Sequence, residues 1–412
     1  MPAAVSTYKV YPYRWVVLAV FMLINLTIQI EWICFAPITG PAAKFYGVSD
    51  LQIGFFAMSF MVVYIPLSIP ISWMIDTLGY RKAVGIGAVL MGLASLLRGV
   101  FATDYNWVLV ATLGVAVAQP FLLNAISTVA AKWFPIEERA TASGLSIVAG
   151  FIGIALGQAL SPGLILSSGI PTMLMVYGVA AAVSSVVFLL FTREAPPTPP
   201  CPPGQETRAL MFDGLRSMLK LKDIWFLLIL YLVGMGIFNG VSTWIEDIVR
   251  PRGFSITDAG DFGAFLLLGG IVGAIVIPLL SDRLHKRKIF LLIGMVLAVP
   301  GMVGFTFATS YWLVVASMLV LGFFLMSLAP IGYQYAAEIT HPAPEGTSNG
   351  LLNLAGQASV VFIYAMEAFK GGDGSFTLSL LIMVVLMIFS SFLISILKES
   401  KMIRAQLDES ST

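Results

Sequence analysis

The two halves of this chain repeat one another. Residues 141–150 read TASGLSIVAG and residues 347–356 read TSNGLLNLAG, a separation of 206 residues in a chain of 412. At the same separation, a D-x4-R-K cluster at residues 76–82 recurs at residues 282–288, after the second long apolar segment of each half. A chain duplicated in this way is expected to form two similar helical bundles around a central cavity.

The composition places the chain in a lipid bilayer. It has 58% hydrophobic and only 11% charged residues, too few charges to cover a soluble globule of this size. Apolar windows long enough to cross a hydrocarbon core fall near residues 14–36, 51–75, 83–102, 106–131, 140–164 and 171–192, and near 224–247, 260–281, 288–307, 311–337, 347–369 and 375–397. We therefore predict an all-α integral membrane protein with twelve transmembrane helices in two pseudo-symmetric six-helix bundles.

A proline-rich stretch separates the two predicted bundles. Residues 193–208 read REAPPTPPCPPGQETR, and so many prolines favour an extended tether. Residues 209–222 then place apolar and cationic side chains on opposite helical faces, which predicts an amphipathic surface helix; a plain solvated linker is the alternative. The predicted boundaries are 1–194 for the first bundle, 195–222 for the linker, 223–400 for the second bundle and 401–412 for a tail.

The placement of positive charge predicts the orientation. When the twelve spans are threaded through a membrane, most of the 23 Lys and Arg residues fall on one side. The residues on the other side are Lys44, Arg98, Arg250, Arg252 and Lys370. Because cytoplasmic loops retain positive charge, we expect both termini in the cytoplasm and the chain in the plasma membrane, as a monomer. The net charge of +1 says nothing about nucleic acid, because the charge asymmetry lies across the membrane, and we expect no nucleic-acid partner.

Polar residues inside the predicted spans are the candidates for a binding site, because their burial in lipid is costly unless they face a cavity. Gln119, Asn239 and Gln357 lie close to mid-depth, and Glu31 and Trp32 lie further along the first span. A tryptophan face attracts cations, and a buried carboxylate adds a Coulomb attraction that is stronger than in water. These five residues favour an organic cation as substrate.

Each of these assignments has an alternative. Glu31 can pair with a cationic substrate, carry a proton, or serve as the structural partner of Arg98. Gln119 and Gln357 can instead be interhelical hydrogen-bonding residues, and Trp32 can be a packing residue. Glu338, at the inner end of its helix, is assigned to a cytoplasmic gate.

Three loops resemble signature loops of the major facilitator superfamily. They are SWMIDTLGYRK at residues 72–82, its copy LLSDRLHKRK at 279–288, and AAKWFPIEERATASGL at 130–145. The resemblance implies that Asp76, Gly79 and Arg81 latch the inner gate, and the copy implies the same role for Asp282 and Arg287. Ordinary cytoplasmic loop charge is the alternative. The first copy begins with Ser72 where the usual pattern has glycine.

Shorter segments are similar to the feline leukaemia virus subgroup C receptor family of choline and haem-associated transporters. They include EWICF at residues 31–35, YIPLSIPISW at 64–73, VAQPF at 117–121 and AAEITHPAPEGTSNGLLN at 336–353. In that family an aromatic cage and two glutamines surround a quaternary ammonium group, and the resemblance maps these onto Trp32, Gln119 and Gln357. Asn239 stands at the position of a cage tyrosine, with Phe238 or Trp244 as the available replacement. Glu31 stands at the position of a glutamine.

Other function classes lack their chemistry in this sequence. An enzyme or a pump needs a metal cluster, an activated nucleophile or a nucleotide-binding loop, and neither H-E-x-x-H nor a Walker motif is present. Both histidines, His285 and His341, fall in predicted loops, so neither is placed to ligate haem at mid-membrane.

We therefore predict a secondary transporter, without a cofactor, that moves a small organic cation such as choline by alternating access. The alternatives are a proton-coupled transporter of another small metabolite or organic anion, and a haem-related exporter. The sequence leaves open the coupling ion and the direction of transport.

Overall fold

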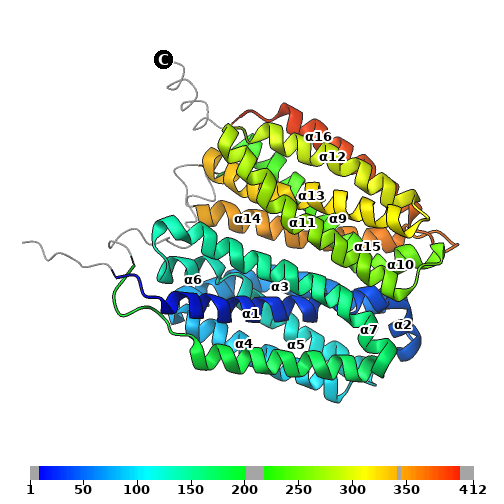
Figure 1. Ribbon diagram of the computed structural model, residues 1–412, viewed down its shortest axis with the longest axis horizontal. Helices are drawn as coiled ribbons and strands as arrows, with labels where there is room; N and C mark the ends of the chain where they lie inside the picture. The colour runs from blue at the N-terminus through cyan, green and yellow to red at the C-terminus, as the bar shows by residue number, and fades with distance from the viewer. Residues whose placement is uncertain (1–8, 201–217, 341–344, 400–412) are drawn as a thin grey trace, which may run out of the picture. The chain divides into compact units, whose positions relative to one another are not determined.

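The computed structural model describes residues 9–200, 218–340 and 345–399, and every regular element in these ranges is helical (Figure 1). The first half contains α1 (Tyr13–Ile33), η1 (Ala36–Ile38), α2 (Thr39–Tyr46), α3 (Asp50–Leu78), α4 (Tyr80–Val100), α5 (Tyr105–Leu123), α6 (Ile126–Trp133) and α7 (Ile136–Phe191). The second contains α9 (Lys222–Thr243), α10 (Ile245–Val249), η2 (Arg250–Arg252), α11 (Ile256–Leu284), α12 (Lys288–Phe307), α13 (Tyr311–Thr340), α14 (Glu345–Ala358), α15 (Val360–Ala368) and α16 (Thr377–Ile396).

The described helices account for the twelve predicted spans. Eleven of them, within the described ranges, are long and apolar enough to cross a membrane. One of the eleven, Glu138–Phe191, has 54 residues and is interrupted at Gly169, whose backbone is not helical (φ 79°, ψ 170°). The predicted windows 140–164 and 171–192 fall on either side of that interruption, so α7 contains two spans. Helices suit this setting because they satisfy their own backbone hydrogen bonds where no water is present.

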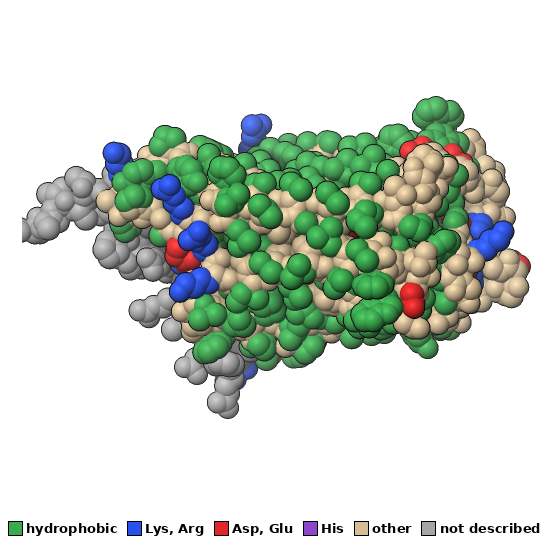
Figure 2. All heavy atoms as spheres, turned by 90° about the horizontal axis from the view of Figure 1, so that it is seen from below, with side chains coloured by type: hydrophobic (Ala, Val, Ile, Leu, Met, Phe, Trp, Pro, Cys, Tyr) green, Lys and Arg blue, Asp and Glu red, His purple; other side chains and the backbone are tan. Residues whose placement is uncertain are grey.

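The surface has the character that a lipid-facing protein requires. Figure 2 shows hydrophobic side chains over much of the visible face, with most of the charged side chains toward the left and right of the view. Large apolar residues such as Leu190 and Trp312 are 72% and 74% exposed. In water such a surface would be unstable, whereas lipid tails solvate it.

The chain divides into two compact units. The first holds the described residues up to 34 together with 59–157 and 163–200, and the second holds 35–58, 158–162 and the described residues from 218 onward. Segments 35–58 and 158–162 therefore cluster with the C-terminal helices, although the predicted boundaries place them in the first bundle. The predicted amphipathic helix at 209–222 and the tail at 401–412 lie largely outside the described residues.

Close backbone contact holds the helices of each unit together. In the first unit, α1 packs against α4, α5 and α6, and Gly153 of α7 lies directly against the backbone of Leu26 in α1. In the second unit α11 packs along α13, where a Cβ atom at Gly269 would overlap the carbonyl group of Leu319. Small residues permit this approach of helices in a membrane, where packing replaces the hydrophobic effect.

The two halves share local geometry at equivalent positions. Helices α3 and α11 each have 29 residues. Each is preceded by a glycine with a left-handed backbone, Gly47 (φ 67°) and Gly253 (φ 83°). Two residues later in each copy, a serine hydroxyl, that of Ser49 or Ser255, accepts a hydrogen bond from a first-turn amide. This agreement supports the duplication predicted from the sequence.

Candidate functional site

One face of α1 carries a row of polar and aromatic side chains. Asn25, Gln29 and Trp32 are spaced four and three residues apart, so they lie on the same side of the helix. Gln119 of α5 donates a hydrogen bond from Nε2 to Oε1 of Gln29, at 3.2 Å. Gln119 is only 4% exposed, and its Oε1 atom has no hydrogen-bond partner among the described residues. The first unit therefore contains a buried acceptor whose amide is hydrogen-bonded to the face of α1 that also carries Trp32. Gln29 was missed from the sequence, although the rule that selected Gln119 also applies to it.

Glu31 points away from this row, toward α4. Arg98 donates from Nη1 to Oε2 of Glu31 at 2.9 Å and to the Glu31 carbonyl at 3.2 Å, and Nη2 contacts Sγ of Cys34 at 3.1 Å. The Glu31 and Arg98 side chains are 2% and 1% exposed. Neighbouring residues on an α-helix point about 100° apart, which separates Glu31 from Trp32. Of the three interpretations of Glu31, the structure shows the third, the ion pair with Arg98.

In the second unit, the candidate residues lie where two helices meet. Asn239 of α9 is 3% exposed and donates from Nδ2 to Oγ of Ser359 at 3.0 Å. Ser359 separates α14 from α15, so the amide of Asn239 secures this junction. Gln357 is half-buried in the last turn of α14, two residues before Ser359.

A tyrosine pair accompanies these amides. Tyr231 of α9 and Tyr333 of α13 have ring centroids 5.1 Å apart. The Tyr333 hydroxyl donates to Oδ1 of Asn353 in α14 at 2.5 Å, and the Tyr231 hydroxyl donates to the Ala329 carbonyl at 2.8 Å. Asn353 is one helical turn before Gln357, on the same side of α14. The tyrosines were not selected from the sequence, because aromatic residues in an apolar span give no polar signal.

Trp244, one of the two residues suggested as a replacement for the cage tyrosine, is a packing residue. Its side chain is fully buried and its Nε1 atom donates to the Ile363 carbonyl at 2.9 Å. Its ring packs against Gly54, and lies 6.0 Å from the Phe376 ring. A side chain with these contacts and no exposed surface belongs to the packed interior of the second unit.

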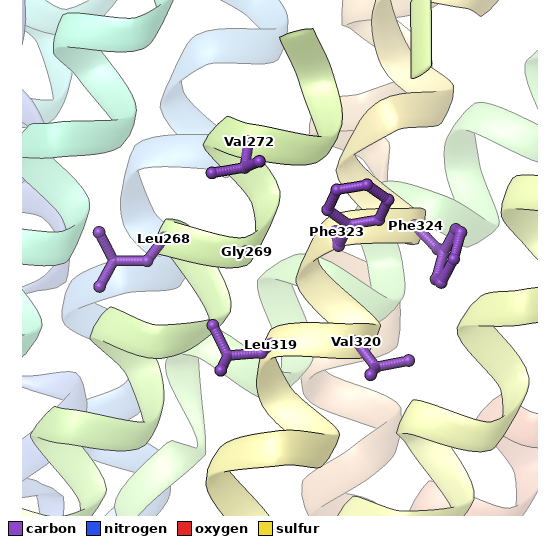
Figure 3. A pocket seen from close by; sticks show the side chains of 7 residues that line it. All are labelled: Leu268, Gly269, Val272, Leu319, Val320, Phe323 and Phe324. Carbon is purple, nitrogen blue, oxygen red and sulfur yellow. The ribbon is translucent and has the colours of Figure 1, made fainter. Parts of the chain in front are cut away.

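The groove drawn in Figure 3 lies elsewhere, between α11 and α13. It has a volume of about 420 Å³ and is lined by Leu268, Gly269, Val272, Leu319, Val320, Phe323 and Phe324. Leu268 and Val272 are half-exposed on the surface of the unit. The lining contains no polar side chain that would recognise a charged solute.

The first copy of the predicted inner latch is held by a residue that was not predicted. Asp76 is exposed, and the described residues form no ion pair with it. Gly79 has a left-handed backbone (φ 85°), and the Arg81 backbone amide donates to Oε2 of Glu194 at 2.8 Å. Glu194 also forms an ion pair with Lys132. The carboxylate of Glu194 therefore caps the start of α4, where anionic groups are favoured.

The second copy brings its predicted residues together. The Arg287 guanidinium forms an ion pair with Asp282 and another with Oε1 of Glu338, at 3.1 Å from Nε. The Arg287 backbone amide donates to Oε1 of Glu399 at 3.0 Å. Glu399 thus caps the start of α12 as Glu194 caps the start of α4.

Comparison with known proteins agrees with this architecture. The family model described as Major Facilitator Superfamily matches residues 21–364 and 245–405. "Choline/ethanolamine transporter FLVCR1" of Mus terricolor is 32% identical over 88% of this chain and 70% of its own length. "Solute carrier family 49 member A3" of Danio rerio is 30% identical over 89% and 80%. A bacterial homolog of the human lysosomal transporter Spinster, solved in an inward-facing and unoccupied conformation, superposes with a TM-score of 0.74 at 17% identity, covering 94% and 97% of the two chains.

Proposed function

Because this chain belongs to the major facilitator superfamily, and within it to the feline leukaemia virus subgroup C receptor family, we propose that it moves choline or a similar small organic cation by alternating access. It is a multi-pass membrane transporter, not an enzyme. The relatives named choline/ethanolamine transporters suggest the substrate class. We further propose that it acts as a monomer in the plasma membrane with both termini in the cytoplasm.

The observation that carries this proposal is the polar face of α1 with its partner Gln119. Trp32 supplies a ring on which a quaternary ammonium group gains about 0.5–2 kcal/mol. Oε1 of Gln119, which is buried and lacks a hydrogen-bond partner within the described residues, would accept the substrate hydroxyl. A buried acceptor left empty costs about 1–3 kcal/mol, so a hydroxyl-bearing cation offsets that cost when it binds.

We assign supporting roles to the other residues. The tyrosine pair Tyr231 and Tyr333 provides a second aromatic surface, and Gln357 provides a second amide. Asn239 secures the junction between α14 and α15 through Ser359. Glu31 fixes α1 to α4 through Arg98 and acts on the substrate only through that positioning.

We propose that the clusters at the starts of α4 and α12 work as the inner gate. Arg287 with Asp282 and Glu338 forms one half of it, and Asp76, Gly79 and Arg81 form the other. During opening, Arg287 exchanges partners between Asp282 and Glu338, which are both already in contact with it. Such an exchange allows opening without leaving a buried charge unpaired.

The test is uptake of radiolabelled choline into proteoliposomes. Gln119→Ala should raise KM about tenfold, the effect of one lost hydrogen bond of about 1.4 kcal/mol, and Trp32→Ala should raise it by a similar factor. Trp107→Ala changes an exposed tryptophan and serves as the matched control for Trp32→Ala. If Gln119→Ala and Trp32→Ala both have the wild-type KM at equal protein density, the proposed site is wrong.

A thermal-shift panel separates the competing substrate classes. Purified protein is heated with choline, ethanolamine, haem or a small organic anion, and a ligand that binds the native state raises the unfolding temperature. We expect an increase with choline that Gln119→Ala removes. An increase with haem or an anion alone would overturn the cation proposal.

A further inference from the structure

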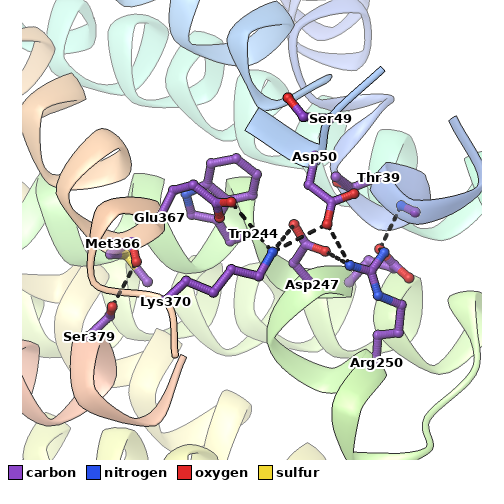
Figure 4. A network of polar contacts seen from close by, with 12 residues as sticks. Thr39, Ser49, Asp50, Trp244, Asp247, Arg250, Met366, Glu367, Lys370 and Ser379 are labelled. Atoms are coloured by element: carbon purple, nitrogen blue, oxygen red, sulfur yellow. Dashed lines mark hydrogen bonds and ion pairs between the residues drawn. The ribbon is translucent and has the colours of Figure 1, made fainter. Parts of the chain in front are cut away.

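Six charged residues of the second unit form one partly buried network (Figure 4). They are Asp50 at the start of α3, Glu246 and Asp247 in α10, Arg250 in η2, Glu367 near the end of α15, and Lys370 just after it. The first of these belongs to segment 35–58, which lies between α1 and the rest of α3 in the chain. The network therefore attaches that segment to the C-terminal helices.

Asp50 is the point of attachment. Its Oδ2 atom lies 2.7 Å from Nη2 of Arg250 and 3.2 Å from Nζ of Lys370, so both cations share it. A second tie runs through Glu246, whose Oε2 accepts a hydrogen bond from the Gly40 backbone amide at 2.9 Å. Movement of segment 35–58 away from α10 must break all of these contacts.

The network contains more negative than positive groups. Four carboxylates, those of Asp50, Glu246, Asp247 and Glu367, face two cations, Arg250 and Lys370. The side chain of Asp247 is 0% exposed and that of Glu246 is 4% exposed. An excess of buried negative charge is unfavourable, and it is relieved when a carboxylate takes up a proton.

Asp247 is the carboxylate best placed to hold that proton. Its Oδ1 faces Arg250, whereas its Oδ2 has no hydrogen-bond partner within the described ranges and lies 3.7 Å from Nζ of Lys370. Burial and the nearby Asp50 charge raise the pKa of Asp247 to about 8, against the lowering effect of the two cations. Glu246 adds a further negative charge from the same helix. In the described part of the chain, α2 and α11 bring no ion-pairing group to Asp247.

We propose that Asp247 is a proton-binding site whose occupancy controls whether segment 35–58 stays attached to α10 and the end of α15. This goes beyond transport of any particular solute, because it depends only on groups within the network. When the segment leaves, the Asp50 charge leaves with it and water reaches Asp247. Its pKa then returns toward the ordinary value, and one proton passes to the solvent.

The sign of the effect follows from linkage. The pKa of Asp247 is higher in the attached arrangement than in the detached one, so a low pH favours attachment. The preference for the attached arrangement declines as the pH rises above the ordinary pKa range of aspartate. It is lost once the pH passes about 8, the pKa of Asp247 in the attached arrangement. One linked proton changes the ratio of detached to attached forms by up to about tenfold per pH unit.

Hydrogen–deuterium exchange of the full chain in lipid nanodiscs, between pH 5.5 and 9, measures the detachment directly without a substrate. Exchange in peptides from residues 35–58, corrected for the intrinsic effect of pH on amide exchange, should rise with pH in the wild type and level off above pH 8. Asp247→Asn mimics the protonated group and should remove this dependence. Asp373→Asn changes an exposed aspartate of a nearby loop and should keep it.

Asp50→Asn provides a second variant, which should exchange rapidly in residues 35–58 at every pH because it weakens the attachment itself. A corrected wild-type profile that is flat, or one that Asp247→Asn leaves unchanged, would overturn the proposal. Failure of choline transport with an intact pH profile would contradict only the proposed function. If Asp247→Asn does not fold, the proposal is tested by the pH profiles of exchange in the wild type, Asp373→Asn and Asp50→Asn.

Discussion

Gly79 and His285 occupy equivalent positions in the two halves and both have a left-handed backbone, with φ values of 85° and 51°. Each directly follows a 29-residue helix, α3 or α11. Glycine adopts this conformation without strain, whereas a residue with a Cβ atom pays about 1–2 kcal/mol. Both positions have a positive φ, although ψ differs, at 150° for Gly79 and 45° for His285.

His285→Gly should stabilise the protein by about 0.5–1 kcal/mol, because it removes the strain and costs some chain entropy. Gly79→Ala should destabilise it by about 1–3 kcal/mol, since a Cβ atom there would also lie 2.6 Å from Oε1 of Glu194. Thermal unfolding in detergent measures both. Gly144→Ala, in a helix with open space around the added carbon, is the matched control and should not destabilise. Equal losses at Gly79 and Gly144 would contradict this account.

Glu31→Gln should destabilise the protein by about 3–5 kcal/mol, because it removes the carboxylate charge that pairs with the buried Arg98 guanidinium. Glu31→Leu combined with Arg98→Leu removes both charges and should recover much of the loss. The control is Glu138→Gln, which breaks the more exposed pair with Arg14 and should cost no more than about 1 kcal/mol. A Glu31→Gln protein with normal stability but no choline uptake would instead favour a direct substrate role.

Gly54→Ala should destabilise the second unit by about 1–3 kcal/mol, because the added carbon overlaps the Trp244 ring. Trp244→Phe makes room for that carbon but loses the hydrogen bond to Ile363. The double variant should therefore lose less than the sum of the two single variants. A double-mutant cycle of unfolding temperatures measures this coupling, and strict additivity would argue against the contact.

Tyr333→Ala should raise the KM for choline about 2- to 30-fold if the tyrosine pair contacts the cation, the range expected for one cation–π interaction. Tyr333→Phe keeps the ring and should remain close to wild type. Tyr364→Ala removes an exposed ring of α15 and provides the control. If Tyr333→Phe reduces uptake as strongly as Tyr333→Ala, the hydrogen bond to Asn353, and not the ring, is the important feature.

The thermal stability of the wild type should decrease between pH 6 and pH 8 relative to Asp247→Asn, by up to about 1.4 kcal/mol per pH unit. The pKa of Asp247 is raised to about 8 in the folded protein, so its contribution is present at low pH and is lost as the pH rises through that value. Parallel pH profiles for the wild type and Asp247→Asn would show that the group does not titrate in this range.

Much of the fold could be predicted from the sequence, because a bilayer imposes simple rules on length and hydropathy. The twelve windows matched the described helices, and even the two windows inside α7 were separated near Gly169. The clustering of residues 35–58 with the C-terminal helices could not be predicted. This clustering depends on the contacts of Asp50 with Arg250 and Lys370, which lie 200 and 320 residues further along the chain.

The site was predicted less completely, for geometric reasons. Glu31 and Trp32 are adjacent in sequence, which suggested one shared site, but neighbouring helical positions face different helices. Gln29 carried the same signal as Gln119, since both are amides within a span, and the hydrogen bond between them identifies it. Whether Trp32, Gln119 and Gln357 bind one substrate stays a prediction.

The carboxylates that cap α4 and α12 determine what a backbone break between the two halves of the chain would separate. Glu194 lies at the start of the proline-rich stretch and caps a helix that precedes this stretch, whereas Glu399 caps a helix that follows it. A backbone break introduced into residues 201–217 would therefore leave each carboxylate on the same fragment as the helix it caps. Two such fragments, co-expressed in one cell, would each retain the carboxylate that caps its own helix.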